Sequence, residues 1–315
     1  MPLQIEILKP LKVRRGIMCL TAVYNEEWFL PHFLDHYRRL GVGHFIFFDD
    51  HSTDATRDIL MKQPDCMVLT SAEKPPAEES RLRGLQMALS HAVPRRFAPG
   101  RWSLRVDADE FLILPRKFSN LPQLTHYLDH RGLACALAAM CDFYPESLDR
   151  RDYDPLPPFQ GSPWFDRALG FQRIPNHVQI RKKPGGIRTR LRDRLYAEQP
   201  EVAKTIFDEE YGFARLWKVP LIKEGQGVVR ADIHDVNVTT PLGIQLALAH
   251  FKFYPGLDKR IAAALESKAY FAGSREYRFL RAAIDHLPDE KLVGDDSIEF
   301  RSPRDMEMAG MIWAD

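Results

Sequence analysis

The amino-acid sequence predicts an α/β fold with a mostly parallel central sheet flanked by helices, followed by a helical C-terminal extension. Short, nearly continuous apolar runs are typical of strands that are buried on both faces. They alternate with segments in which apolar residues recur at helical spacing, and this alternation predicts a mostly parallel sheet. The 315 residues, 45% of them hydrophobic and 28% charged, suffice for one large domain or two small ones.

The first half of the chain alternates predicted strands and helices. The run from Gly16 to Val23 predicts a buried strand, and Gly41 and Gly43 end the helix that follows it. Further strands are expected at residues 44–48, 67–70 and 103–106, and helices at residues 28–40, 55–62 and 77–92.

The second half is less regular. Helices are expected at residues 121–130, 257–271 and 277–287, and a buried strand at residues 134–141. The proline-rich stretch from Pro145 to Pro163 predicts a long surface loop, and the residues from Lys291 predict a polar tail. We therefore expect one domain at residues 1–255 and a helical extension at residues 256–315, with a separate domain after Pro155 as the alternative.

Cysteine usage and the length of the apolar runs bear on location. No two of the four cysteines form a CxxC pair, and Cys19 and Cys135 lie inside apolar runs, which favours a reducing compartment. The apolar runs are far shorter than the roughly 20 residues of a membrane-spanning helix. We therefore expect neither secretion nor a transmembrane anchor. The expected location is the cytoplasm, with peripheral contact at the inner face of the membrane as an option.

One segment is strongly basic, although the net charge of +1 excludes a strong overall field. Its only acid is Asp193, and the excess of positive charge favours an anionic partner or a membrane surface, while a solvated loop explains it equally well. No aromatic residue lies in the segment, so we do not expect nucleic acid as a partner. The basic residues are Arg181, Lys182, Lys183, Arg188, Arg190, Arg192 and Arg194.

Polar residues follow several of the predicted strands. The carboxyl ends of parallel strands meet at one edge of the sheet, and ligands of α/β sheets bind beyond that edge. We therefore expect a binding site there. The residues are Thr21, Tyr24, Asn25 and Glu26 after the first strand, Asp49 and Asp50 after the second, and Asp107 and Asp109 after the fourth.

Asp107 and Asp109 are the candidate metal ligands. Only Ala108 separates them at the end of an apolar run, so both carboxylates are expected at the strand end. Such a pair suits Mn²⁺ or Mg²⁺ shared with the phosphates of a substrate. The alternative is an exposed strand end without a ligand, because turns are rich in Asp.

Three strings of residues carry a family resemblance. Their order and spacing resemble the nucleotide-sugar half of the family 2 glycosyltransferases, which have a GT-A fold, and more narrowly a bacterial family 2-like branch related to family 92. The strings are TAVYNEE at residues 21–27, DDHSTDAT at 49–56 and VDADEFL at 106–112. Shorter matches are GGIRTR at residues 185–190, KVPLIK at 218–223 and HFKFY at 250–254.

The resemblance implies a metal-dependent glycosyltransferase. It would transfer a sugar from a nucleoside-diphosphate sugar, with UDP favoured, to a glycan or lipid-linked acceptor with inversion. Residues 16–114 would form the nucleotide-sugar half and residues 115–255 the acceptor half. A sugar nucleotidyltransferase, and a non-catalytic protein that binds nucleotide sugars or glycans, are the alternatives.

The resemblance also implies roles for individual residues. Tyr24 and Asn25 would line the nucleotide pocket, Asp50 would accept a hydrogen bond from the base, and Asp107 and Asp109 would hold the cation. Further candidates for binding the nucleotide sugar are Thr21, Arg81, Arg83, Arg188, Arg190, Lys218 and Lys252.

The catalytic base is left open, because the chain lacks the Glu-Asp pair and the Gln-x-x-Arg-Trp string that many relatives have. Asp142 is the first candidate, since it ends a predicted buried strand, and Glu146 and Asp166 follow it.

A third metal ligand is expected from a histidine far down the chain. His250 is favoured over His234, because Lys252 would lie on the same side of an extended segment and meet a phosphate beside the ion. A buried histidine bonded to the backbone is the alternative in each case.

Overall fold

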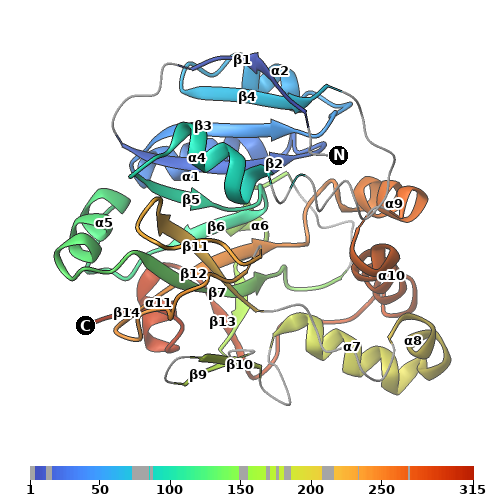
Figure 1. Ribbon diagram of the computed structural model, residues 1–315. Coiled ribbons are helices and arrows are strands. Elements are labelled where there is room, and N and C mark those ends of the chain that lie inside the picture. Colours follow the sequence, from blue (N-terminus) through green and yellow to red (C-terminus); the bar gives the residue numbers. More distant parts are fainter. Residues whose placement is uncertain are drawn as a thin grey trace.

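The computed structural model confirms the α/β class. It describes residues 4–11, 16–72, 85, 88–148, 155–167, 171–174, 177–180, 186–207, 216–232, 234–268 and 270–315. Figure 1 shows one large sheet with helices on both sides.

The central sheet has ten strands in the order β1-β4-β3-β2-β5-β11-β7-β12-β14, with β6 paired to β12. The strands of its first half are β1 (Ile5–Lys9), β2 (Ile17–Val23), β3 (Val42–Asp49), β4 (Cys66–Ser71), β5 (Trp102–Arg105) and β6 (Glu110–Ile113). The others are β7 (Cys135–Phe143), β11 (Trp217–Lys223), β12 (Ile244–Phe251) and β14 (Trp313–Ala314).

The sheet is mixed, which corrects the expectation of a mostly parallel one. The pairs β2–β3, β3–β4, β2–β5 and β7–β12 are parallel. The pairs β1–β4, β5–β11, β7–β11, β6–β12 and β12–β14 are antiparallel. No strand was expected at β11, and the composition of a strand does not indicate its direction, so nothing pointed to a strand that runs against its two neighbours.

The helices are short and lie at both faces and at one side of the sheet. Those of the first half are α1 (Phe29–Arg39), α2 (Thr56–Met61), the π-helix η1 (Ala88–Ala92), α4 (Val93–Phe97) and α5 (Leu121–His130). The later ones are α6 (Pro158–Gly161), α7 (Ile187–Glu198), α8 (Pro200–Ile206), α9 (Leu257–Ser267), α10 (Phe271–His286) and α11 (Pro303–Met308). Two small sheets pair β9 (Phe171–Ile174) with β10 (His177–Ile180) and β8 (Trp164–Asp166) with β13 (Ser297–Glu299).

The parallel strands are buried on both faces, as their apolar runs predict. In β3, Phe45 and Phe47 belong to the core that includes Phe33 of α1. The alternate residues Ile46 and Phe48 belong to a separate core on the other face, with apolar residues of η1 and α4. Successive side chains of a strand point to opposite faces, so a strand covered on both sides needs apolar residues throughout.

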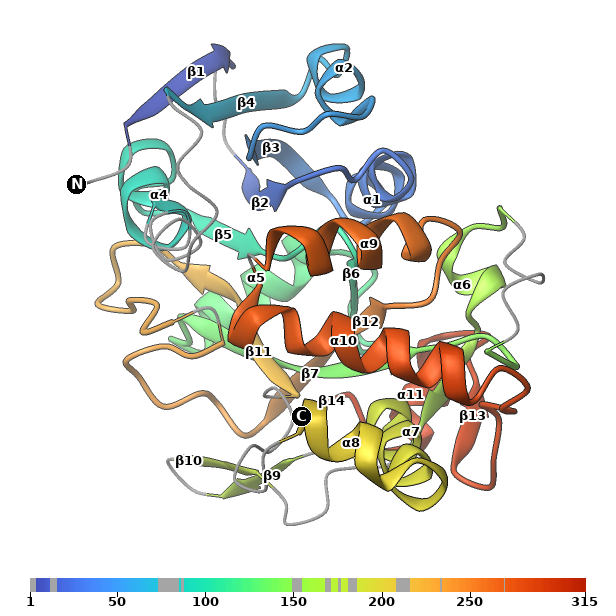
Figure 2. The same cartoon turned by 90° about the vertical axis from the view of Figure 1, so that its right-hand side faces the viewer.

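The end of the chain folds back onto the sheet, which corrects the expectation of a polar tail after Lys291. Trp313 pairs with Gln245 of β12, and the hydroxyl of Tyr127 donates to the backbone oxygen of Asp315 at 2.8 Å. The last sixty residues therefore contain β13, α11 and β14 besides the expected helices. Figure 2 shows α9 and α10 side by side, with α7 and α8 next to α10.

Two further observations concern the expected location. No helix in the described part of the chain is long and apolar enough to cross a membrane. The four cysteines are free and buried, and burial raises the pKa of Cys135 to about 11.

Candidate active site

The strand order marks where a ligand is expected to bind. The chain runs outward from β2 to β3 and β4, and then crosses to the other side of β2 to form β5. In open α/β sheets, ligands bind at the carboxyl ends of the strands where the order reverses in this way. β5 ends opposite Leu20, whereas β2 continues to Val23. The reversal point therefore lies between the loop that begins at Tyr24 and the loop that contains Asp107.

Asn25 connects the loop after β2 with the loop after β3. Its carboxamide oxygen accepts a hydrogen bond from the backbone of Thr53 at 2.7 Å, and its amide nitrogen donates to the Thr53 hydroxyl at 3.2 Å. The backbone of Asn25 has φ 57°, a left-handed conformation that Asn tolerates better than most residues. The side chain of Asn25 thus fixes the two loops that bound one side of the site.

Arg260 of α9 holds the same loop from the other side. Its guanidinium donates to the backbone oxygen of Asn25 at 3.1 Å and forms an ion pair with Glu26. It also donates to the hydroxyls of Tyr254 at 3.3 Å and Tyr270 at 3.1 Å. No sequence pattern points to this residue, because the segment of α9 has the pattern of an ordinary amphipathic helix.

The two acids after β3 differ in their surroundings. Asp49 is fully buried, and its carboxylate accepts from the backbone of Ser52 at 2.9 Å and from Arg57 at 2.5 Å. Asp50 is also buried, and its backbone nitrogen donates to the oxygen of Val23 at 2.9 Å. Asp50 therefore lies beside the end of β2, while Asp49 stabilises the loop.

Thr21 and Tyr24 take up different positions. Thr21 is 1% exposed within β2, and its hydroxyl lies 3.7 Å from the sulfur of Cys19. Tyr24 is half-buried and is the first residue after β2. Thr21 is thus buried within the protein, whereas Tyr24 lies at the edge of the sheet where the nucleotide pocket is predicted.

Asp107 is paired with a buried lysine. The Nζ atom of Lys218, at the start of β11, lies 3.1 Å from Asp107 and 2.7 Å from Glu110. The side chain of Asp107 is 55% exposed, whereas that of Lys218 is 3% exposed. The protein atoms around the carboxylate limit its solvation and would raise the pKa of Asp107, but the charges of Lys218 and Arg105 outweigh this effect and hold that pKa well below its ordinary value.

Asp109 faces a second lysine and a histidine. Its Oδ2 atom lies 3.0 Å from Nζ of Lys252 and 3.5 Å from Nε2 of His250. The antiparallel pairing of β6 with β12 places His250 opposite Glu110. His250 and Lys252 therefore lie beside the loop that contains Asp109. Among the described residues, the predicted neighbours Asp109, His250 and Lys252 thus do meet.

Asp142 orients His250 and Arg188. The parallel pairing of β7 with β12 puts Asp142 beside His250, whose Nδ1 donates to Asp142 at 2.7 Å. The other carboxylate oxygen accepts from Nε of Arg188 at 2.6 Å, and Arg188 also contacts Glu276 of α10 at 2.9 Å. Against the effect of burial, Arg188 and His250 hold the pKa of Asp142 well below its ordinary value. With both oxygens occupied, Asp142 is poorly placed to act as the catalytic base.

His234 contacts the backbone. Its Nδ1 lies 2.7 Å from the carbonyl oxygen of Trp217, which can only accept, so Nδ1 carries the proton. Burial and the charge of Lys218 lower the pKa of His234. His250, not His234, is the histidine in contact with a member of the Asp107–Asp109 pair.

The basic segment does not form an open anion-binding patch in its described part, which begins at residue 186. Arg188 lies inside the site, and Arg190 pairs with Asp166 at 2.9 Å and donates to the Tyr144 hydroxyl at 3.0 Å. Arg194 pairs with Glu290 at 3.1 Å. Arg181, Lys182 and Lys183, like Arg81 and Arg83, lie outside the described residues.

A divalent cation does not fit the carboxylates as they are arranged. Among the described residues, no three His, Cys, Asp or Glu side chains gather as a metal-binding group. The carboxylates of Asp107, Asp109 and Glu110 contact Lys218 and Lys252 instead. The predicted Mn²⁺ or Mg²⁺ has no support from this geometry.

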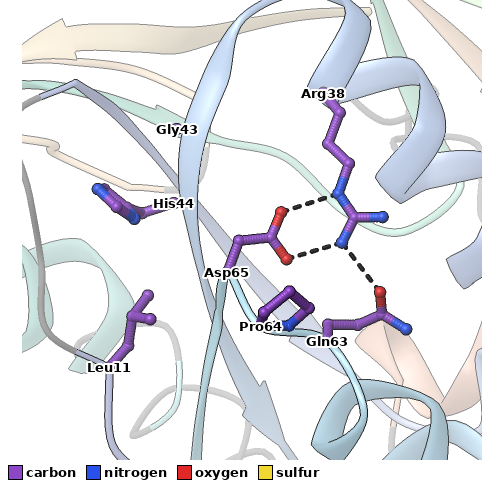
Figure 3. A pocket seen from close by; sticks show the side chains of 7 residues that line it. All are labelled: Leu11, Arg38, Gly43, His44, Gln63, Pro64 and Asp65. Carbon is purple, nitrogen blue, oxygen red and sulfur yellow. Dashed lines mark hydrogen bonds and ion pairs between the residues drawn. The ribbon is translucent and has the colours of Figure 1, made fainter.

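A hollow of about 560 Å³ lies at the opposite edge of the sheet (Figure 3). It is lined by Gly43 and His44, at the start of β3, and by Asp65, just before β4. Arg38 pairs with Asp65 at 2.7 Å and donates to Gln63 at 2.9 Å, so these charged groups satisfy one another. The polar cluster at the carboxyl edge is the stronger candidate for chemistry.

Comparison with known proteins adds little. No family model and no curated protein matches the chain. Among solved structures, the glycosyltransferase TarS of S. aureus matches with 13% identity and a TM-score of 0.31, over 81% of this chain and 39% of that chain. A nucleotidyltransferase, 4-diphosphocytidyl-2C-methyl-D-erythritol synthase, matches with 16% identity and a TM-score of 0.26, over 44% of this chain and 64% of that chain. The chain thus spans less than two thirds of either protein, and likenesses this weak assign no family.

Proposed function

We propose that this chain is a glycosyltransferase that uses a nucleoside-diphosphate sugar, with UDP favoured as the nucleotide. The observation that carries the proposal is the position of the polar cluster. The Asp107–Lys218 and Asp109–Lys252 pairs lie at the carboxyl edge, next to the point where the strand order reverses. The resemblance of residues 21–27, 49–56 and 106–112 to the family 2-like enzymes supports it independently.

The residues divide into two groups in this proposal. Tyr24, Asn25 and Asp50 bound the side that takes the nucleoside, because they follow the strands on one side of the reversal point. The cationic side chains beside Asp107 and Asp109 lie where the diphosphate would be. Glycosyl transfer leaves negative charge on the departing diphosphate, and fixed cations stabilise that charge in the transition state.

The acceptor is proposed to be a glycan or a lipid-linked sugar on the cytoplasmic side, and transfer is proposed to proceed with inversion. The base that would take the proton of the acceptor hydroxyl is not assigned, since each oxygen of buried Asp142 already accepts a hydrogen bond, one from His250 and one from Arg188. Helices α9 and α10 supply Arg260 and Glu276 to the site. They are therefore proposed to be part of the transferase and not a separate binding module.

A donor screen with product analysis tests the proposal. The purified protein is mixed with a panel of nucleotide sugars, thermal stabilisation is recorded, and the products of the stabilising donor are identified. A glycosyltransferase releases nucleoside diphosphate by transfer or slow donor hydrolysis. A nucleotidyltransferase that is given a nucleoside triphosphate and a sugar phosphate instead joins them and releases pyrophosphate. A binding protein is stabilised and releases nothing.

Matched variants locate the activity. Asp50→Asn is expected to reduce donor affinity, because Asp50 is proposed to accept from the base. Asp193→Asn is the control, since the side chain of Asp193 is 68% exposed and lies outside the cluster. Equal donor affinity in both variants would contradict the proposed nucleoside side of the site.

A further inference from the structure

We propose that Lys252, supported by Lys218, takes the place of a divalent cation at Asp107 and Asp109, so that the site binds the donor diphosphate without a metal ion. The identity of the ligand rests on the proposed function. The position of the lysines rests only on the contacts within the cluster.

The segment from Asp107 to Glu110 is matched by cations of the chain itself. Its carboxylates are those of Asp107, Asp109 and Glu110. Lys218 contacts two of them and Lys252 contacts the third. Buried Arg105 adds a further positive charge that acts on Asp107 and Glu110. Sites for Mn²⁺ or Mg²⁺ present carboxylates whose negative charge is not neutralised by the protein. In this segment, the lysines and Arg105 neutralise most of the negative charge.

The two lysines differ in what they have left to donate. An ammonium group has three N–H donors. Lys218 is 3% exposed and bonds Asp107 and both oxygens of Glu110, so its donors are used. In the described part of the chain, Lys252 donates to one acceptor, Asp109, at 3.0 Å, and its side chain is 15% exposed. Lys252 therefore has donors for phosphate oxygens, while Lys218 holds Asp107 and Glu110 in place.

The surroundings hold the Lys252 ammonium at this position. Phe251 donates through its backbone nitrogen to the oxygen of Asp109 at 3.0 Å, which fixes β12 against the loop. Asp109 pairs directly with the ammonium, and Glu276 of α10 adds negative charge nearby. The ammonium therefore lies between the carboxylate of Asp109 and the position proposed for the diphosphate, with donors left for the phosphate oxygens. A fixed ammonium is a common phosphate-binding group.

A titration with Mn²⁺ in the absence of nucleotide tests whether Lys252 occupies the position of a divalent cation. Wild-type protein is titrated with Mn²⁺ by calorimetry alongside Lys252→Met, with exposed Lys259→Met as the matched control. Removing Lys252 frees the carboxylate of Asp109, whose Oδ2 atom lies 3.5 Å from Nε2 of His250. We expect no binding in wild type or Lys259→Met, and a gain of at least about tenfold in Mn²⁺ affinity in Lys252→Met. Tight Mn²⁺ binding by the wild type overturns the proposal.

Nucleotide titration tests the ligand. UDP is titrated into the protein in the presence of EDTA and, separately, in the presence of Mn²⁺. We expect similar affinities in the two conditions, a loss of at least about tenfold in Lys252→Met, and near-normal affinity in Lys252→Arg, which keeps the charge. Binding that requires Mn²⁺ overturns the metal-free site and leaves the proposed function standing. Absence of UDP binding in both conditions, with no donor found in the screen, overturns the proposed function and the diphosphate role of Lys252 together.

Discussion

Replacing Arg260 with methionine removes the residue that joins the C-terminal helices to the loop after β2. Four groups lose a donor: the Glu26 carboxylate, the Asn25 carbonyl oxygen and the hydroxyls of Tyr254 and Tyr270. The hydroxyls can turn to other partners, so the main cost is that the buried carboxyl of Glu26, whose pKa burial raises to about 7, loses its ionic partner.

The size of that cost follows from burial. The side chains of Arg260 and Glu26 are 12% and 14% exposed. Breaking a buried ion pair costs about 3–5 kcal/mol, and this residual exposure favours the lower end, about 3 kcal/mol. For a chain of this size we expect a fall in Tm of roughly 6 °C, at roughly 2 °C per kcal/mol.

The assay is thermal and urea unfolding of Arg260→Met and of the double variant Arg260→Met/Glu26→Gln. The double variant should recover most of the loss, because it also replaces the buried carboxyl of Glu26 that has lost its partner. Arg281→Met is the control, since its partner Asp285 is 40% exposed and such surface pairs contribute about 1 kcal/mol or less. A double variant as unstable as Arg260→Met would refute the reasoning, and so would a Tm of Arg260→Met within about 1 °C of wild type.

Three further predictions concern the same edge of the sheet. Arg188→Met should destabilise the protein by about 3 kcal/mol in urea unfolding, because buried Asp142 loses its arginine partner and keeps only the hydrogen bond from His250, whereas Arg194→Met, whose side chain is 49% exposed, should cost about 1 kcal/mol or less. Asn25→Gly should be more stable than Asn25→Ala by about 1 kcal/mol, because Gly accepts φ 57° without strain, while both variants lose donor affinity with the tie to Thr53; equal stability would contradict the left-handed backbone. The pKa of Asp142 is lower in the folded than in the unfolded state, so its contribution to stability is present above the unfolded pKa of about 3.9 and is lost as pH falls through the folded pKa. The free energy of unfolding, measured with urea, should therefore fall more steeply below about pH 4 in wild type than in Asp142→Asn. Parallel curves for the two proteins would contradict this.

The sequence was sufficient to predict that several site residues lie at one edge of the sheet. Asp107, Asp109, Asp142 and His250 each end or follow an apolar run, and they lie together because parallel strands end at one edge. Lys252 could be added from its spacing to His250 in an extended segment. These predictions rest on local patterns that survive folding.

Other parts of the site have no local pattern. Arg260 and Glu276 lie on helices whose apolar faces predict packing but not which polar residue turns toward the sheet. Arg188 was expected to meet an anionic partner and instead pairs with Asp142 inside the protein. Such pairs depend on contacts between distant segments, and a sequence shows a side chain's charge without its partner.

The sequence by itself determined the α/β class, the buried strands and the acids at their ends, because apolar periodicity and strand length are set by neighbouring residues. Only the tertiary structure decided the direction of β11, the return of the C-terminus to β12, and the pairing of Asp107 and Asp109 with Lys218 and Lys252. The last of these matters most for function. Two acids one residue apart predict a cation, but whether that cation is a metal ion or an ammonium depends on which side chains the fold brings within hydrogen-bonding distance.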